Sequence, residues 1–528
     1  MAATATHRRP VAARGPKRES GGPLSPLSIG LHLTVAALVS FVALWRTATV
    51  DPASDQRTYL VCGYRYLEGK GVGCNFEHPP LAKVVLGIAL HLFGNTPAGG
   101  LAVVGVLSIA TAIVLYLLVR SASNWALGLV AAGLWGLTPQ AGVENGTVTE
   151  AFRITRFALL DPFLCFFFAL ALLGGWLWWQ RRSWWWAALT GFSCVAAACS
   201  KEVGMVLAPS IIAMPLLAIG LQSVRTAVRD AGIVAAGGVV AFIASYAAFG
   251  PAEAWSEIRY LITFQLHHAS LGASPIFHGH LYPVAPWWAI TRYGIDGLGA
   301  GFAVFLAAAA VAGILGTPAL SLYALIPSGV ILAVMSFSHL AYPFYWVDVE
   351  PGVIVAAALG IGWCCTARWS RITAVVASVV LVGVPSASMI VDIATASPGV
   401  YRQAAARIDC PPGCILVYLG YRGMFESDLT GKPVLGLPGG PNILLIGQGT
   451  PDQIPTNPPG IQSRLPDYVV VDPLTAYAQF IFVAEVTRFE AIASQLGYVE
   501  VPSGSRLKIW KLSSYGPTRA TLAAAPRR

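Results

Sequence analysis

The chain has 528 residues, of which 55% are hydrophobic and only 11% are charged. Together with a mean hydropathy of +0.64, these fractions exclude an ordinary soluble domain and indicate a protein that resides in a bilayer. The net charge of +9 comes mostly from basic residues at both termini and in short turns. That distribution suggests contact with anionic membrane lipids and gives no reason to expect nucleic acid as a partner.

Residues 1–26 are rich in arginine and lysine and precede the first long apolar run. No cleavage site of the small-x-small type follows a short apolar core there, so the segment is not read as a removed signal peptide. We expect a basic cytoplasmic tail followed by a first membrane anchor.

Apolar runs of membrane-spanning length recur between residue 27 and residue 395. The pattern predicts about eleven transmembrane helices. They lie near residues 27–46, 100–119, 124–141, 157–179, 184–200, 203–221, 232–250, 295–315, 319–338, 343–363 and 372–394.

One apolar segment, Leu81 to Phe93, is too short to span and is followed by Gly94-Asn95. If this segment lies at the interface, most basic turns fall on one side, as the positive-inside rule requires. We therefore predict an interfacial helix and an integral protein of the cell membrane with a cytoplasmic N-terminus. The basic residues that decide this are Arg120, Arg181, Arg182, Arg225, Arg229, Arg368 and Arg371.

This topology sends segments 47–99, 142–156, 251–294 and 395–528 to the outer side. After residue 395 the long apolar runs give way to short β-type runs, such as Ile415–Leu419 and Tyr468–Asp472, around a stretch rich in Gly and Pro. The sequence thus predicts a transmembrane domain at 27–395, a small extracytoplasmic α/β domain at 396–515 and a disordered tail at 516–528.

Four of the nine cysteines lie in the predicted outer segments, where an oxidising environment permits disulfides. They form two close pairs, Cys62 with Cys74 and Cys410 with Cys414, and each pair is a possible disulfide. The other five lie in apolar spans and are read as small hydrophobic side chains.

The outer segment 47–99 carries Asp55-x-x-x-Tyr59 and then Glu77-His78-Pro-Pro-Leu-x-Lys83. With Arg153-Ile-Thr-Arg156-Phe-Ala-Leu-Leu-Asp161 and Ser200-Lys201-Glu-Val-Gly204, these motifs cover roughly the first 210 residues. In this order they resemble the protein O-mannosyltransferases and the lipid A aminoarabinose transferases, which are membrane glycosyltransferases of GT-C architecture that use polyprenyl-phosphate sugars.

The resemblance implies a glycosyltransferase of the cell envelope that moves a hexosyl or pentosyl group, with inversion, from a polyprenyl-phosphate donor to an acceptor on the outer face. It implies Asp55 as the catalytic base, which must act alone because Gln56 stands where the family usually has a second acid. The side chains expected to bind the donor phosphate or substrate are Tyr59, Glu77, His78, Arg153, Arg156 and Lys201.

Each of these residues also has a purely structural interpretation. Asp55 can cap a juxtamembrane helix, and His78 can pack at a helix start before its two prolines. The two arginines can be interfacial anchors or pair with Glu150 or Asp161. Lys201 can pair with Glu202 or extend to the membrane surface. The acids Asp348 and Glu350, at the outer end of the tenth predicted span, can assist acceptor binding or cap the helix, and the cap is favoured.

Four histidines in 251–294 suggest a metal at first sight, but their spacing matches no known ligand pattern. They are His267, His268, His278 and His280. We therefore expect no metal site and no cofactor besides the lipid-linked sugar. A polytopic lipid or solute transporter with an outer binding domain is the alternative function, and an inactive structural protein is a third.

Overall fold

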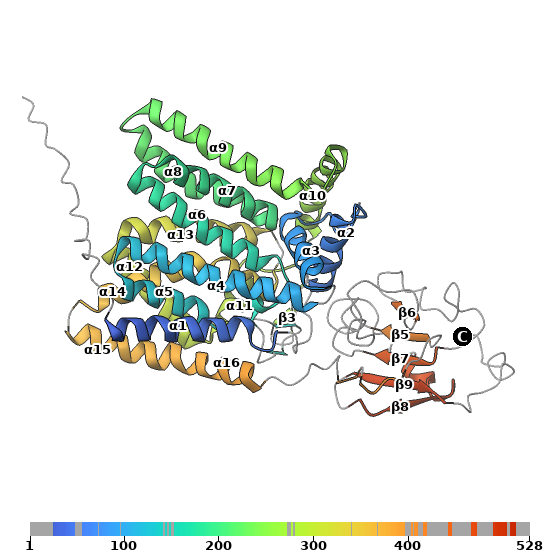
Figure 1. The fold of residues 1–528 in the computed structure, drawn as a ribbon. Coiled ribbons are helices and arrows are strands. Elements are labelled where there is room, and N and C mark those ends of the chain that lie inside the picture. The colour runs from blue at the N-terminus through green and yellow to red at the C-terminus, as the bar shows by residue number, and fades with distance from the viewer. Residues whose placement is uncertain are drawn as a thin grey trace, which may run out of the picture.

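The computed structural model describes most of the chain from Ser25 to Ser513. The described residues are 25–47, 55–71, 73–94, 97–140, 143–144, 147–148, 153–271, 276–277, 280–282, 284–338, 341–366, 368–395, 403–404, 406–409, 415–419, 442–445, 466–471, 489–503 and 507–513. Within these ranges the molecule is a bundle of helices followed by one larger β-sheet (Figure 1).

The first half of the bundle comprises nine α-helices and two short 3₁₀ turns among the described residues. They are α1 (Pro26–Leu44), α2 (Gln56–Leu67), α3 (Leu81–Phe93), α4 (Pro97–Ala122), α5 (Trp125–Leu137), η2 (Ile154–Arg156), α6 (Asp161–Arg181), α7 (Trp184–Ser200), η3 (Glu202–Val206), α8 (Leu207–Gly220) and α9 (Val224–Tyr246).

The second half begins with α10 and ends at residue 395. Its elements are α10 (Pro251–Leu271), α11 (Ala289–Leu298), α12 (Ala300–Gly316), α13 (Pro318–Phe337), η4 (Pro343–Asp348), α14 (Glu350–Cys364), α15 (Arg368–Ala377), the π-helical turn η5 (Ser378–Val382) and α16 (Gly383–Thr395). Two small hairpins, β1–β2 (Val143–Glu144, Thr147–Val148) and β3–β4 (Ile276–Phe277, His280–Leu281), lie between helices.

All eleven predicted spans contain helix, but their number as membrane crossings stays a prediction. Seven described helices are long and apolar enough to cross, or eight if α11 and α12, which meet at 109°, form one broken span. The expected spans at α5, α7 and α14 form helices of 13, 17 and 15 residues. The polar residues that end these helices early are among those that build the site described below.

Close helix contacts depend on glycine, as is usual in membrane bundles. A Cβ atom at Gly63 of α2 would overlap the carbonyl oxygen of Lys83 in α3, and one at Gly87 of α3 would overlap that of Gly63. Gly360 and Gly313 bring α14 and α12 together in the same way. The α2–α3 contact matters most here, because each of these two helices carries part of the motif region.

The predicted interfacial segment forms α3 with the predicted limits. In Figure 1, α2, α3 and α10 lie at one end of the bundle, outside the array of long helices, and the β-sheet lies beyond the same end. The described helices α2, α3 and α10 and the described sheet therefore lie toward one end of the bundle, and the side of the membrane that this end faces stays a prediction.

The C-terminal sheet has five described strands in the order β6-β5-β7-β9-β8. The strands are β5 (Ile415–Leu419), β6 (Asn442–Leu445), β7 (Tyr468–Val471), β8 (Tyr498–Val501) and β9 (Lys508–Leu512). β5 pairs in parallel with both β6 and β7, whereas β9 runs antiparallel to β7 and β8. Both predicted strands form, and Val469, Val471, Ala493 and Tyr498 make a small core of their own, separate from that of the helices.

Candidate active site

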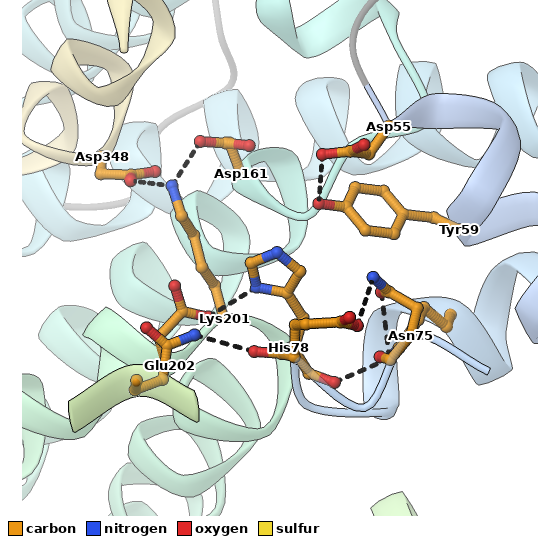
Figure 2. Close-up of polar contacts among 11 residues, drawn as sticks. Asp55, Tyr59, Asn75, His78, Asp161, Lys201, Glu202 and Asp348 are labelled. Carbon is orange, nitrogen blue, oxygen red and sulfur yellow. Dashed lines mark hydrogen bonds and ion pairs between the residues drawn. The ribbon is translucent and has the colours of Figure 1, made fainter. Parts of the chain in front are cut away.

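Asp55 stands at the start of α2 in the N-cap position, but its side chain makes no capping hydrogen bond. The hydroxyl of Tyr59, one turn later, lies 3.5 Å from Asp55 Oδ2 (Figure 2). Tyr59 is buried, and burial, followed by the charge of Asp55, raises its pKa well above the usual value. Its hydroxyl therefore stays protonated at neutral pH and can donate to Asp55.

The motif loop 74–78, between α2 and α3, is held by buried Lys83 of α3. The ammonium group donates to the carbonyl oxygens of Asn75, at 2.5 Å, and His78, at 2.7 Å. From the other side Gln265 of α10 donates to the carbonyl oxygen of Glu77 at 2.8 Å. A disulfide between Cys62 of α2 and Cys74, with a Cα–Cα distance of 5.5 Å, closes the loop onto α2. The loop is thus held by side chains from three helices, two through hydrogen bonds and one through the disulfide.

The side chains of Glu77 and His78 point to different partners. Asn75 Nδ2 donates to Glu77 Oε2 at 3.0 Å, so the Glu77 carboxylate bonds within its own loop. His78 Nδ1 lies 3.0 Å from Oε2 of Glu202, on η3. The imidazole ring also meets the ring of Tyr59 edge-on, with 5.8 Å between centroids. His78 therefore links the motif loop both to α2 and to the break after α7.

Lys201 occupies that break, where the backbone leaves α7 in an extended conformation before η3 begins. Its ammonium group lies 2.6 Å from Asp161 Oδ1, at the start of α6, and 2.5 Å from Asp348 Oδ2, at the end of η4. It also lies 4.2 Å from the ring centroid of Tyr345. All three side chains are almost completely buried, which is tolerable because Lys201 pairs with both acids.

Three segments far apart in sequence thus meet at Lys201, and two interpretations made from the sequence change. Lys201 pairs with Asp161 and Asp348, not with Glu202, and Asp348 binds the lysine and does not cap α14. Glu350 also makes no cap, because it accepts a hydrogen bond from Gln140 at 2.9 Å.

Arg153 and Arg156 do not join this cluster. Arg153 donates to the carbonyl oxygens of Trp135, Gly136 and Thr138 at the end of α5, and to the Thr155 hydroxyl. Arg156 donates to those of Val42 and Trp45 at the end of α1. Both side chains are 1% exposed. Both arginines therefore cap helix C-termini. We do not assign them the predicted role of a phosphate clamp.

The site includes residues that sequence reasoning did not select. The sequence predicts only pairing roles for Asp161 and Glu202, and it favours a helix cap for Asp348. The sequence does contain a signal for these residues, because each is an acid at the end of an apolar run. A carboxylate that is buried there needs a polar partner. Which partner each one has could not be read from the sequence.

Some predicted features lie outside the described residues. These are the Cys410–Cys414 pair, His278 and Glu150, and nothing is described of the side chains of His268 and His280. Within the described part of the chain, no group of three or more His, Cys, Asp or Glu residues is arranged to hold a metal ion.

Comparisons with known proteins find one matching family model and similar solved structures. A family model described as dolichyl-phosphate-mannose-protein mannosyltransferase matches residues 77–248, which include His78 and Lys201. ArnT from Cupriavidus metallidurans bound to undecaprenyl phosphate has a similar structure, with a TM-score of 0.58 and 15% identity over 94% of this chain and 100% of ArnT. The structure of apo ArnT from the same organism has a TM-score of 0.57 and 15% identity, over 93% of this chain and 99% of ArnT. No curated protein matches the chain.

The helical bundle has the fold of ArnT, and seven or eight of the described spans are long and apolar enough to cross a membrane. The chain is similar to the mannosyltransferase family model over residues 77–248 and to ArnT in structure over nearly its whole length. Neither similarity supports the transporter alternative.

Proposed function

We propose that this protein transfers a sugar from a polyprenyl-phosphate carrier to an acceptor hydroxyl on the outer face of the membrane. The observation that carries the proposal is the meeting of Asp55, Tyr59, His78 and Lys201, from three separate parts of a GT-C fold, at the end of the bundle that holds α2 and α3 (Figure 2). Undecaprenyl phosphate in the similar ArnT structure supports a lipid phosphate as carrier.

The reaction is a single displacement at the anomeric carbon. The bond from that carbon to the carrier phosphate oxygen breaks, and its electron pair leaves with the phosphate. A bond to the acceptor oxygen forms, and the acceptor proton passes to Asp55. A carboxylate in this position accelerates such a transfer by about 10²–10⁴. One displacement inverts the anomeric configuration, so we expect inversion.

Asp55 fits the role of base better than the role of cap. Its side chain is partly exposed and makes no capping hydrogen bond to α2. The neighbouring hydroxyl of Tyr59 is the donor that orients it. The next residue, Gln56, is buried and has an amide in place of a carboxylate; its amide oxygen accepts a hydrogen bond from the backbone N–H of Ala158 at 3.2 Å. Asp55 therefore acts as the base without a second acid next to it.

The test is transfer by the purified full-length protein from a panel of polyprenyl-phosphate hexoses and pentoses to peptide, lipid and glycan acceptors. Product analysis by mass spectrometry identifies the sugar and the acceptor, and NMR of the new anomeric centre tests inversion. Turnover with at least one donor is expected. Substrate exchange across vesicles without any glycosidic product would instead support transport.

With the active donor, Asp55→Asn is expected to lower kcat by about 10²–10⁴, because the acceptor proton loses its base. Binding of undecaprenyl phosphate should be retained. Asp296→Asn is the matched control, since Asp296 pairs only locally with Arg292 of the same helix at 3.0 Å. Full transfer by a folded Asp55→Asn protein would exclude Asp55 as the base.

A further inference from the structure

Helix α10 (Pro251–Leu271) begins where a helix of membrane-spanning length ends. α9 is long and apolar enough to cross a bilayer, and only residues 247–250 separate its last residue, Tyr246, from α10. Figure 1 shows α10 beside the end of α9, outside the array of long helices. An extended chain covers at most about 3.6 Å per residue. The start of α10 therefore lies close to the level at which α9 leaves the bilayer.

Large apolar side chains form a stripe along the exposed side of α10. Trp255, Ile262 and Leu266 are 67%, 55% and 74% exposed. An α-helix turns about 100° per residue, so these three positions lie within about 40° of one another around the helix axis. Exposed apolar side chains that are contiguous in this way mark a contact surface.

A second stripe on the exposed side of α10 is polar. Ser256, Thr263 and His267 are exposed. By the same rotation they lie roughly 100° around the axis from the apolar stripe. Arg259 is also exposed, at a position between the two stripes. A helix on a membrane surface needs this order, because its apolar side meets acyl chains, its basic side chains meet lipid phosphates and its polar side meets water.

The remaining side of α10 packs on the protein and reaches the motif loop. Glu257 is completely buried, and Gln265 donates to the carbonyl oxygen of Glu77 at 2.8 Å. Both positions face away from the two exposed stripes. α10 thus connects the exposed apolar stripe with the loop that carries His78.

Continuity with α9 indicates what covers the apolar stripe. The second half of α9 exposes Val239, Val240 and Ile243 at 56%, 59% and 62%, on a helix of spanning length. The apolar surface of this span therefore continues onto α10. A protein partner is a poorer fit, because three side chains supply only part of the roughly 800 Å² that each partner buries in a stable interface.

We propose that α10 lies on the membrane surface at this end of the bundle, with Trp255, Ile262 and Leu266 inserted between the lipid head groups and the acyl chains. Tryptophan is enriched at this depth of a bilayer. The inference concerns an interaction surface and does not depend on the proposed sugar transfer. It places the motif loop, which Gln265 contacts, beside the lipid head groups.

The experiment puts a fluorescent amino acid in place of Ile262 or of the adjacent Thr263, in full-length protein in nanodiscs of phosphatidylcholine and phosphatidylglycerol. Doxyl-labelled lipid quenches emission inside the bilayer, and iodide quenches emission in water. Quenching by doxyl lipid should be about threefold stronger at position 262, and iodide should show the reverse order, because the two positions lie on different stripes. Leu266 and Ser256 form a second pair of positions and should repeat this result.

Removing the apolar stripe tests its role directly. With the probe at position 262, Trp255→Ser together with Leu266→Ser should lower quenching by doxyl lipid about twofold, because the helix loses apolar contact with the bilayer. Ser256→Ala together with Thr263→Ala, on the polar stripe, is the matched control and should leave the quenching unchanged.

Three results would overturn the membrane contact. Strong quenching by iodide at position 262 would show that the stripe lies in water. Protection from both quenchers would show that protein covers it, from this chain or a second copy. Equal quenching by doxyl lipid at positions 262 and 263 would show that α10 is not oriented by its stripes.

Discussion

At the scale of single residues, Arg153 and Lys201 show that a buried charged side chain binds polar groups of the protein itself. The last carbonyl groups of a helix have no partners within that helix, and in a bilayer protein water cannot reach them. Arg153 supplies three donors to the end of α5, where the planar guanidinium group matches several carbonyl oxygens at once. The same chemistry that suits Arg to a phosphate therefore also suits it to a helix end.

This assignment predicts that Arg153→Lys lowers stability and spares ligand affinity. One ammonium group cannot reach all the carbonyl oxygens that the guanidinium serves, so we expect a loss of about 2 kcal/mol or more. Thermal unfolding in detergent measures it, with exposed Arg259→Lys of α10 as control. The folded fraction should bind undecaprenyl phosphate with unchanged Kd. A large loss of affinity with unchanged stability would restore the phosphate-clamp interpretation.

Glu257 of α10 is a second residue whose burial has measurable consequences. It is completely buried, and neither carboxylate oxygen has a hydrogen-bond partner among the residues that the structure describes. Burial raises its pKa to about 7, although the charge of Lys83 opposes the rise. Burial in turn lowers the pKa of Lys83 to about 8, opposed by Glu257.

A raised carboxyl pKa makes the folded state hold a proton that the unfolded state releases between pH 4.5 and about 7. The contribution of Glu257 is thus fully present at low pH and is lost as pH rises through 7. We expect the unfolding midpoint of the unmodified protein to fall relative to Glu257→Gln, by on the order of 1–3 °C, between pH 5 and pH 8. Midpoints that run parallel across this range would contradict the assignment.

At the scale of elements, α2 and α3 form one unit that carries the motif loop. Their backbones approach through Gly63 and Gly87, so the two helices pack directly on each other. The Cys62–Cys74 disulfide then ties the loop to α2, next to a small apolar cluster that includes Tyr66, Phe76 and Phe249.

Replacing both cysteines, in Cys62→Ser with Cys74→Ser, should lower stability. The disulfide closes a short loop, with a sequence separation of 12, and such a constraint is worth about 3 kcal/mol in the chain-entropy model. Thermal unfolding without reductant is the measurement. With reductant, the unfolding midpoint of the unmodified protein should approach that of the double variant. The midpoint of the double variant should not change with reductant. Alkylation of Cys62 in the unreduced, denatured protein would show that the bond does not form.

At the scale of the whole molecule, the polar segments gather at the end of the bundle that carries the candidate active site. The motif loop, α10 and the C-terminal sheet lie at one end of the bundle (Figure 1). From the positive-inside rule we propose that this end faces the outer side. We propose a membrane domain at 27–395 and an outer domain at 396–515, with residues 1–26 as a cytoplasmic tail and 516–528 as a second tail.

Cysteine labelling in intact cells tests this orientation. A membrane-impermeant maleimide should label Glu500→Cys, at an exposed position of β8, in intact cells. Gln222→Cys, exposed in the turn between α8 and α9, should react only after permeabilisation. The five free cysteines described in the structure lie in or next to apolar helices, and the parent protein provides the background signal. The opposite labelling pattern would reverse the topology.

Much of the fold could be predicted from sequence, because its signals are local. Hydropathy placed helix in all eleven predicted spans, the limits of α3 followed from a short apolar run, and β5 and β7 followed from short β-type runs. The number of crossings did not follow, since helices such as α5 and α14 are shorter than a bilayer is thick. Whether such a helix crosses depends on its tilt and its neighbours.

The sequence by itself determined that this is a membrane protein, and its motifs brought Asp55, Tyr59, His78 and Lys201 into consideration. Only the tertiary structure decided what each side chain contacts: Lys201 with Asp161 and Asp348, His78 with Glu202, and the two arginines with helix ends. The physical reason is that a buried charge must find a partner, while sequence spacing does not specify a partner that lies 40 or 147 residues away.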